Sequence, residues 1–355
     1  MKLTNSILTT LLFIAIYLFH SPQALSNTRI SANHPDIAYM GRIHWDDKGH
    51  GMFNYPGTTA LLRFKGTALD METSPGSGKF IVEIDNGAPQ QIVYTSSDSL
   101  LTIAKNLSNT LHTARITYAI EGYEFNPQFR SFAIDGELLP ANEKHDVKIE
   151  FIGNSITCGY GIEDTNKDNG FSYDTENHTL TYAYKTAREL DADFNVVARS
   201  GIGIYRNYGG PIEGDTKTMP LEYDYTMLYN HDYEWDHSSF HPDIICINLG
   251  TNDTSLDTYD ISLYESYYRD FLTHLRQLHP DSKIVLLTGC MLQGQALTDV
   301  KEALDRITQD YPNTYRFDMS PHTGELGYGA SYHPSKLQAE KMASELTPFL
   351  RSLIQ

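Results

Sequence analysis

The chain is poor in cysteine. Its 355 residues include only Cys158, Cys246 and Cys290, which cannot all pair within one chain. A framework of disulfide bonds is therefore excluded as the source of its stability. We expect buried free thiols, with a bond between Cys158 and Cys290 as the alternative.

Positive charge is also scarce. The chain has 27 Lys and Arg against 45 Asp and Glu, which gives a formal net charge of -18. This balance argues against nucleic acid and anionic membranes as partners, and it makes a polyanionic substrate unfavourable. A neutral substrate fits better. The 24 tyrosines are in keeping with carbohydrate, because flat amphipathic rings stack on the faces of sugars.

Long apolar runs are missing except at the start of the chain. The start of the chain has the pattern of a signal peptide: a positive charge at Lys2, an apolar run over 7–19 and a small-x-small cleavage site at Ala24-Leu25-Ser26. The run is short for a membrane span, and no second one follows. We expect residues 1–26 to be removed and the mature protein to be secreted or periplasmic, without membrane insertion. An uncut membrane anchor is the alternative.

Residues 27–145 show the pattern of an all-β region. Short apolar runs alternate with turn signals, and no clear amphipathic helix interrupts them. The strongest signal is the run 80–84, the tight turn Asp85-Asn86-Gly87 and the returning run 91–94. The spacing predicts a β-sandwich that ends in a short polar linker at 140–144.

Residues 146–355 instead alternate strands with helices. This pattern predicts a parallel sheet covered on both faces, which binds ligands at the carboxyl ends of its strands. A long segment at 205–241 interrupts the pattern, and such connections are usually functional or mobile. One helix is expected to bury Leu263, Tyr267, Phe271, Leu275 and Leu278, and the last to bury Met342, Leu346, Phe349 and Leu353. The strands are expected at 147–151, 194–198, 244–248, 283–288 and 315–318.

Ser155 is the candidate nucleophile because it directly follows the first of these strands. A serine hydroxyl attacks a carbonyl only when a base within hydrogen-bond reach takes its proton. His333 is the candidate base, since it begins the last helical stretch and the following Pro334 favours extended backbone. A packing or surface position is the alternative for one histidine among 14.

Three hydrogen-bond donors follow other strands or begin a helix. They are the backbone N–H of Ser155, the backbone N–H of Gly201 and the side-chain amide of Asn252. Donors fixed in this way stabilise the oxyanion of an acyl-transfer reaction. Taken singly, Gly201 and Asn252 are equally explained as turn or cap residues. Together with His333, they favour a serine esterase.

The same residues carry a family resemblance. Residues 153–155 (GNS), Gly201, 250–253 (GTND) and 333–334 (HP) resemble four sequence blocks of SGNH/GDSL hydrolases. The resemblance is closer still to carbohydrate esterase family 2, whose members join an N-terminal jelly roll to an SGNH domain. Residues 41–43 (GRI), 156–161 (ITCGYG) and 201–210 (GIGIYRNYGG) look like signatures of that family.

The resemblance implies an acetylxylan esterase-like activity that removes acetyl groups from sugars and xylan-type polysaccharides, commonly at the primary 6-hydroxyl. It implies Ser155 as the nucleophile and His333 as the base. It also implies an oxyanion hole of Ser155, Gly201 and Asn252.

Two positions depart from the common SGNH pattern. Asn154 stands where most members have aspartate, which removes a charge beside the nucleophile. Ala330 stands three residues before His333, where triads place the aspartate that orients the imidazole, and Ser331 cannot replace it. We therefore expect a Ser–His dyad, with the histidine held by a backbone carbonyl. Asp318 is a distant alternative partner.

Aromatic residues near these motifs are candidates for stacking on a sugar ring. Tyr332 adjoins His333, and Tyr205, Tyr208 and Trp235 lie in the long segment, where core or lid packing is the alternative. The histidines and aspartates of 231–243 match no standard zinc spacing, and residues 201–203 lack the rest of a phosphate-binding loop. No metal or cofactor is expected.

The prediction is thus an exported carbohydrate O-acetyl esterase of α/β fold, acting without cofactor on an acetylated oligo- or polysaccharide. One alternative is an SGNH esterase, lipase or thioesterase acting on other esters. The other is a non-catalytic glycan-binding protein, which the missing acid at Ala330 makes conceivable.

Overall fold

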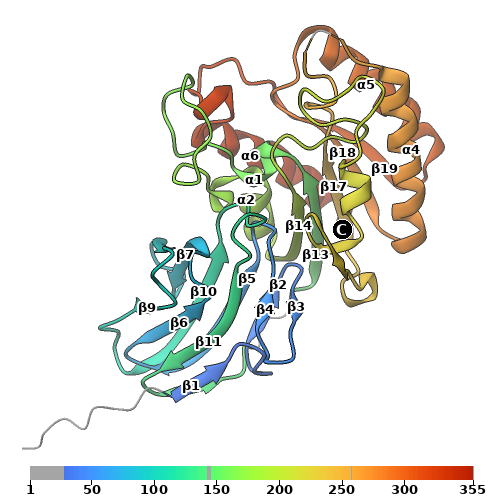
Figure 1. Cartoon of the computed structure of the whole chain (residues 1–355). Helices are drawn as coiled ribbons and strands as arrows, with labels where there is room; N and C mark the ends of the chain where they lie inside the picture. The colour runs from blue at the N-terminus through green and yellow to red at the C-terminus, as the bar shows by residue number, and fades with distance from the viewer. Residues whose placement is uncertain (1–27, 142–144, 257, 355) are drawn as a thin grey trace, which may run out of the picture.

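A computed structural model describes residues 28–141, 145–256 and 258–354 of the chain. The expected signal peptide at 1–26 and most of the expected linker, at 142–144, lie outside the described residues. Figure 1 shows a sandwich region (28–141) made of strands and a parallel-sheet region (145–354) with helices. No helix in these ranges is long and apolar enough to cross a membrane.

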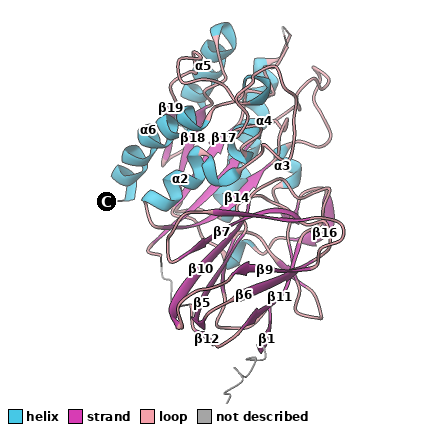
Figure 2. Cartoon of the chain, turned by 90° about the vertical axis from the view of Figure 1, so that its left-hand side faces the viewer, coloured by secondary structure: helices cyan, strands magenta, loops and turns pink. Residues whose placement is uncertain are grey.

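The sandwich region consists of two antiparallel sheets, as the sequence predicted (Figure 2). The sheets enclose a core in which Phe53, Phe64, Phe80 and Phe132 are fully buried. One sheet contains β1 (Thr28–Ser31), β3 (His44–Trp45), β4 (Gly51–Met52), β6 (Leu69–Thr73), β9 (Leu100–Ala104) and β11 (Gln128–Ile134). The other contains β2 (Ala38–Met40), β5 (Thr59–Gly66), β7 (Gly78–Ile84), β8 (Gln90–Tyr94), β10 (Thr110–Tyr118) and β12 (Glu137–Leu139).

The tight turn between β7 and β8 is confirmed. Asp85 and Asn86 have φ of 53° and 55°, as both central residues of a type I′ hairpin turn require. The N–H of Gly87 donates to the carbonyl of Ile84 at 2.8 Å. Short polar residues at these positions thus set the pairing of the two strands.

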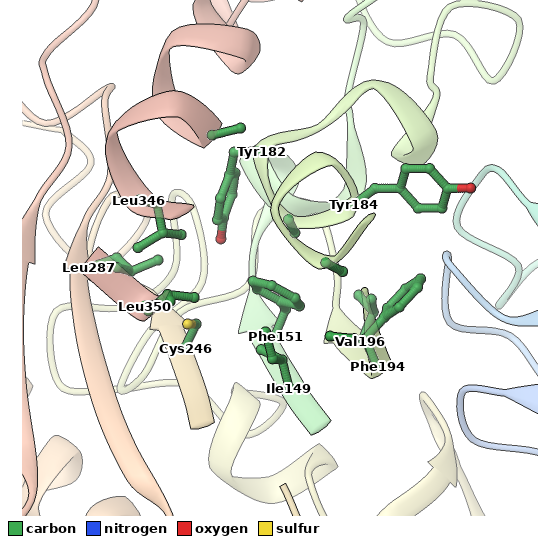
Figure 3. Close-up of a cluster of buried hydrophobic side chains, with 14 of the residues drawn as sticks. Ile149, Phe151, Tyr182, Tyr184, Phe194, Val196, Cys246, Leu287, Leu346 and Leu350 are labelled. Atoms are coloured by element: carbon green, nitrogen blue, oxygen red, sulfur yellow. The ribbon is translucent and has the colours of Figure 1, made fainter. Parts of the chain in front are cut away.

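The parallel-sheet region has the predicted architecture. Its strand order is β14-β13-β17-β18-β19, and every neighbouring pair is parallel. Ile149 and Phe151 pack on one face with α2 and α6, as Figure 3 shows, whereas Ile152 and Ile245 pack on the other with α4 and α5. The strands are β13 (Val147–Gly153), β14 (Ala192–Ala198), β17 (Ile244–Asn248), β18 (Lys283–Thr288) and β19 (Thr314–Asp318). The helices are α1 (Ser155–Cys158), α2 (Tyr182–Glu189), α3 (Met219–Glu222), α4 (Ile261–Leu278), α5 (Gly294–Asp310) and α6 (Lys336–Ile354), with short 3-10 turns η1 (His178–Leu180), η2 (His237–Ser239) and η3 (Ala330–Tyr332).

The buried face of α4 differs from the expected one. Phe271 and Leu275 are buried as expected, but Tyr267 is 38 % exposed. The helix instead buries Tyr264 and Tyr268, one position further along the chain. Tyrosine at 264, 267 and 268 satisfies either face in a hydropathy pattern, so only packing against the sheet selects one.

The long segment at 205–241 joins the two regions. It contains α3 and the hairpin of β15 (Tyr225–Met227) and β16 (Asn230–Glu234). The Asn54 side chain from the sandwich region exchanges two hydrogen bonds with the backbone of Leu228, at 3.1 and 2.8 Å. Arg42 forms a fully buried ion pair with Glu150 on β13 at 3.1 Å. The segment is therefore a structural connection between the sheets as well as a long loop.

Candidate active site

Ser155 and His333 lie in direct contact although 178 residues separate them. The Oγ of Ser155 is 2.8 Å from the Nε2 of His333. Ser155 opens the one-turn helix α1 directly after β13, and it is 7 % exposed. His333 follows η3 at the entrance to α6. The separation is short enough for the imidazole to take the proton of the hydroxyl.

The segment that carries His333 is sharply bent. Ser331 and Tyr332 both have positive φ, 48° and 60°, a conformation that non-glycine residues rarely adopt. Gly161 makes room for the bend, because a Cβ there would lie 2.4 Å from the Cβ of Ala330. Its carbonyl also accepts the N–H of Ala330 at 3.1 Å. The glycine at the end of the ITCGYG signature thus allows the close approach that brings the histidine to the serine.

A backbone carbonyl occupies the other side of the imidazole. The Nδ1 of His333 is 3.0 Å from the carbonyl oxygen of Ala330, the residue that stands where triads have an acid. Asp318, the distant alternative, is engaged elsewhere, with Lys301 at 3.0 Å and Arg316 at 3.1 Å. The carbonyl requires a proton on Nδ1, so the lone pair of Nε2 faces Ser155.

Tyr160 packs against the same imidazole, and sequence analysis gave it no role. Its ring stacks on His333 with the centroids 4.0 Å apart and the planes 17° from parallel. The Tyr160 hydroxyl is 3.2 Å from the Oγ of Ser331. Burial in this setting lowers the pKa of His333 to about 4, so the ring is neutral at ordinary pH. The only signal in the sequence was the place of Tyr160 directly before Gly161 in a predicted signature.

The three expected oxyanion donors converge on one cavity. A hollow of about 530 Å³ is lined by Ser155, Gly201, Asn252 and His333 together. Gly201 has φ +80° in a turn closed by the N–H of Ile202 on the carbonyl of Arg199, at 3.2 Å. The Nδ2 of Asn252 donates one hydrogen to the carbonyl of Ile202 at 2.7 Å, which leaves its second N–H for a ligand.

Residues 199–202, which we call the oxyanion turn, are followed by a second anchored stretch. The buried Oδ1 of Asp253 accepts the backbone N–H groups of Ile204, Tyr205 and Arg206 at 2.8, 2.9 and 3.4 Å. Burial raises the pKa of Asp253 to about 6. Sequence analysis placed Asp253 in a motif but missed this anchoring role, because its partners lie about fifty residues earlier in the chain.

Asn154 acts as the N-cap of α1. Its Oδ1 accepts the N–H of Ile156 at 3.1 Å, and the residue is fully buried. The departure from aspartate therefore preserves a hydrogen bond while placing no charge beneath Ser155.

The aromatic candidates divide into two exposed residues and two packed ones. Tyr332 is 49 % exposed, with its hydroxyl 3.0 Å from the Nζ of Lys167, so it remains a candidate. Tyr205 is wholly buried, and its hydroxyl accepts the N–H of Asp260 at 3.0 Å, so the expected stacking role is wrong. Trp235 packs against the buried Arg42, 5.2 Å from guanidinium carbon to ring centroid, which assigns it to the junction of the regions. Tyr208 lines the cavity and is 66 % exposed.

The described residues contain one group with the composition of a metal site. Glu121, Cys158 and Glu176 are all buried and place their ligand atoms within 4.8 Å of one another. Both carboxylate oxygens of Glu121 already accept hydrogen bonds from Ser200, and burial raises the pKa of the Cys158 thiol. This is the arrangement of a hydrogen-bonded cluster. All three cysteines are free and buried, so the alternative disulfide is not formed.

This fold and cavity agree with comparisons to known proteins. Residues 151–317 match the model of the GDSL-like Lipase/Acylhydrolase family, and residues 39–141 match the model described as Carbohydrate esterase 2 N-terminal. The fold and the match together define a hydrolase of carboxylic esters.

Relatives narrow the class. An acetylxylan esterase / glucomannan deacetylase of Cellvibrio japonicus is 30 % identical over 336 residues, which cover 93 % of this chain and 92 % of that protein. The Cellulase/esterase CelE of Acetivibrio thermocellus is 31 % identical over 330 residues, and the match spans 40 % of its length. The solved family two carbohydrate esterase from Cellvibrio japonicus superimposes with a TM-score of 0.85, at 29 % identity over 93 % of this chain and 98 % of that one. One from Clostridium thermocellum, solved in complex with cellohexaose, gives 0.83 at 31 % identity over 90 % and 99 %. The chain belongs to carbohydrate esterase family 2.

Proposed function

We propose that this protein removes O-acetyl groups from acetylated sugars and xylan-type polysaccharides by a Ser–His acyl-enzyme mechanism. The observation that carries the proposal is the 2.8 Å contact between Ser155 and His333 in the cavity that Gly201 and Asn252 also line. The names of the Cellvibrio japonicus relative, acetylxylan esterase and glucomannan deacetylase, support the substrate class.

In the first half of the reaction, Ser155 attacks the acetyl carbonyl while its proton passes to the Nε2 of His333. Negative charge develops on the carbonyl oxygen, and the N–H groups of Ser155, Gly201 and Asn252 stabilise it. The tetrahedral intermediate collapses when the protonated His333 returns a proton to the sugar oxygen. The sugar leaves with its free hydroxyl, and the acetyl group stays on Ser155.

In the second half, water replaces the sugar. His333 takes a proton from the water as its oxygen attacks the acetyl carbon, and the same donors hold the second oxyanion. The bond between the acetyl carbon and the Ser155 oxygen then breaks. Acetate leaves, and the proton on His333 restores the hydroxyl.

A carbonyl in place of a carboxylate has a chemical consequence. The Ala330 oxygen fixes the tautomer of His333 but offers no full negative charge to the imidazolium. The stacked Tyr160 ring supplies part of that stabilisation, because the face of an aromatic ring attracts a cation. A dyad of this kind works where the base is positioned firmly.

The test is replacement of the nucleophile. Ser155→Ala is expected to lower acetate release from acetylated xylan or a 6-O-acetyl hexose by about 10⁴-fold or more. Ser344→Ala, a change at an exposed serine of α6, is the matched control and should retain full activity. Wild-type turnover in the Ser155 variant would end the proposal.

A different ester is the second candidate substrate. Met291 and Leu256 add apolar surface to the cavity, as acyl chains of lipids or thioesters would require. Aryl esters of increasing acyl length distinguish the two, since acetate should far outpace octanoate if the sugar proposal holds.

Export and domain limits are part of the proposal. We expect cleavage after Ser26, a sandwich domain over 27–145 and an SGNH domain over 146–355. Intact mass of the protein collected from the medium or periplasm measures the first expectation, and a mature chain that retains residues 1–26 would contradict it.

A further inference from the structure

A buried carboxylate from the sandwich region accepts two hydrogen bonds from the oxyanion turn. Glu121 follows β10 and is 3 % exposed. One carboxylate oxygen accepts the backbone N–H of Ser200 at 2.7 Å, and the other accepts the Ser200 hydroxyl at 2.5 Å. The two bonds fix both the main chain and the side chain of the residue directly before Gly201.

The orientation of Ser200 determines where the Gly201 N–H points. Ser200 and Gly201 are the two central residues of the oxyanion turn, and the peptide between them is free of the closing bond from Ile202 to Arg199. A rotation of that peptide would carry the N–H away from the cavity. Asn252 binds the carbonyl of Ile202 on the same turn, so both donors outside α1 depend on one short stretch of backbone.

A second buried glutamate holds Glu121 in place. Glu176, from the segment between α1 and η1, accepts the backbone N–H of Glu121 at 3.1 Å. Burial, then the charge of Glu121, raises the pKa of Glu176 well above its usual range, so Glu176 keeps its proton. Glu121 can then act as the acceptor for Ser200 with a neutral neighbour in place of a second buried charge.

We propose that Glu121 is a positioning residue through which the sandwich region sets the geometry of the oxyanion hole. The inference rests on the proposed function and assigns the sandwich region a part in the chemistry, although none of its described residues lines the cavity. A lost or rotated donor lowers turnover rather than ground-state binding, because the donor acts on the charge of the transition state.

The test is Glu121→Gln in the full chain. A carboxamide keeps the volume but has one acceptor oxygen and no charge, so Ser200 can donate only one of its two hydrogen bonds and the charge-assisted hold on the turn is lost. We expect kcat on an aryl acetate to fall about 10- to 100-fold with KM within about twofold of wild type. Glu83→Gln is the matched control, since Glu83 on β7 accepts the Tyr184 hydroxyl at 3.2 Å and also links the two regions, away from the cavity. It should keep wild-type kcat.

A transition-state analogue gives a second readout. Phenylboronic acid forms a tetrahedral adduct with an active-site serine, and one boronate oxygen occupies the oxyanion position. Its affinity for Glu121→Gln should fall by the same factor as kcat/KM, whereas a purely structural defect would lower the active fraction and leave the affinity of the remainder unchanged.

A variant of Ser200 tests the same contact from the other side. Ser200→Ala loses only the hydroxyl bond and should lose less kcat than Glu121→Gln. The double variant should lose less kcat than the product of the two single losses, because both changes remove the same contact.

The outcomes separate the two proposals. Wild-type protein that releases no acetate from any acetyl ester overturns the proposed function. Active wild type with Glu121→Gln at the level of Glu83→Gln overturns the role of Glu121 alone. A raised KM with unchanged kcat and boronate affinity also overturns it, because it would place Glu121 in substrate binding.

Discussion

The two sides of the proposed catalytic cavity are held in place by different chemical groups. The imidazole of His333 rests on a neutral carbonyl and an aromatic ring, from Ala330 and Tyr160. The oxyanion side is anchored by two buried acids, Glu121 at Ser200 and Asp253 at the stretch that follows the turn. A carboxylate thus supports the proposed oxyanion donors, whereas a carbonyl supports the proposed base.

This difference shows that orientation and charge stabilisation are separable. A carboxylate behind histidine does both, whereas the carbonyl does only the first. Without the negative charge, burial dominates and the pKa of His333 falls to about 4. As the proposed base, His333 is therefore weak, but it is unprotonated over a wide range of pH. Because a weak base contributes less, firm placement of the proposed oxyanion donors becomes more important.

The largest expected effect comes from removing the base. His333→Ala should lower kcat/KM by about 10⁴-fold or more, because Ser155 then has no proton acceptor within reach. Acetate release at saturating and limiting substrate measures the loss, with His34→Ala, at a half-buried position in the sandwich region, as control. A loss below about tenfold would mean that another group takes the proton of Ser155 and that His333 is not the base.

Removal of an oxyanion donor should have the next largest effect. Asn252→Ala deletes the amide that faces the cavity and is expected to lower kcat about 100-fold with little change in KM. The same change frees the carbonyl of Ile202. Steady-state kinetics on an aryl acetate gives both constants, and an unchanged kcat would remove Asn252 from the oxyanion hole.

The pH profile examines the base side alone. Since the lowered pKa keeps His333 neutral down to about 4, kcat/KM should hold on the acid side until about pH 4 and then fall roughly tenfold per unit. With the usual histidine pKa of about 6.5, the fall of kcat/KM on the acid side would begin more than two pH units higher. A limb near 6.5 in the wild-type profile would contradict the buried, uncharged setting that the structure gives to the imidazole.

The smallest expected effect concerns the stacked ring. Tyr160→Ala exposes the imidazole to water and removes the ring face, so we expect about a fivefold loss of kcat, in keeping with about 1 kcal/mol, and an acid limb shifted upward. Tyr160→Phe keeps the stack and loses only the contact with Ser331. Equal losses of kcat in Tyr160→Ala and Tyr160→Phe would show that the hydroxyl, and not the ring, supports His333.

Much of the fold was predictable from local pattern. The strands after residue 146 were placed because apolar runs of four to six residues alternate with amphipathic helices. The hairpin at Asp85-Asn86-Gly87 was placed because few residues accept two positive φ values in succession. The face of α4 was not predictable, since three tyrosines satisfied both faces. For Tyr205 the sequence left stacking and core packing as alternatives, and only the structure shows its ring in the core.

The sequence by itself determined the chemical groups and their order along the chain, because strand-end motifs such as Gly153-Asn154-Ser155 and the unusual Ala330 can be read without coordinates. Only the tertiary structure decided which groups meet. The carbonyl behind His333 and the ring on its face depend on a bend at Ser331 and Tyr332. The hydrogen bonds between Glu121 and Ser200 join residues 79 positions apart in the chain, from two different regions. Contacts of that length have no local signal, since they arise from how the two regions pack and not from the propensities of the residues that make them.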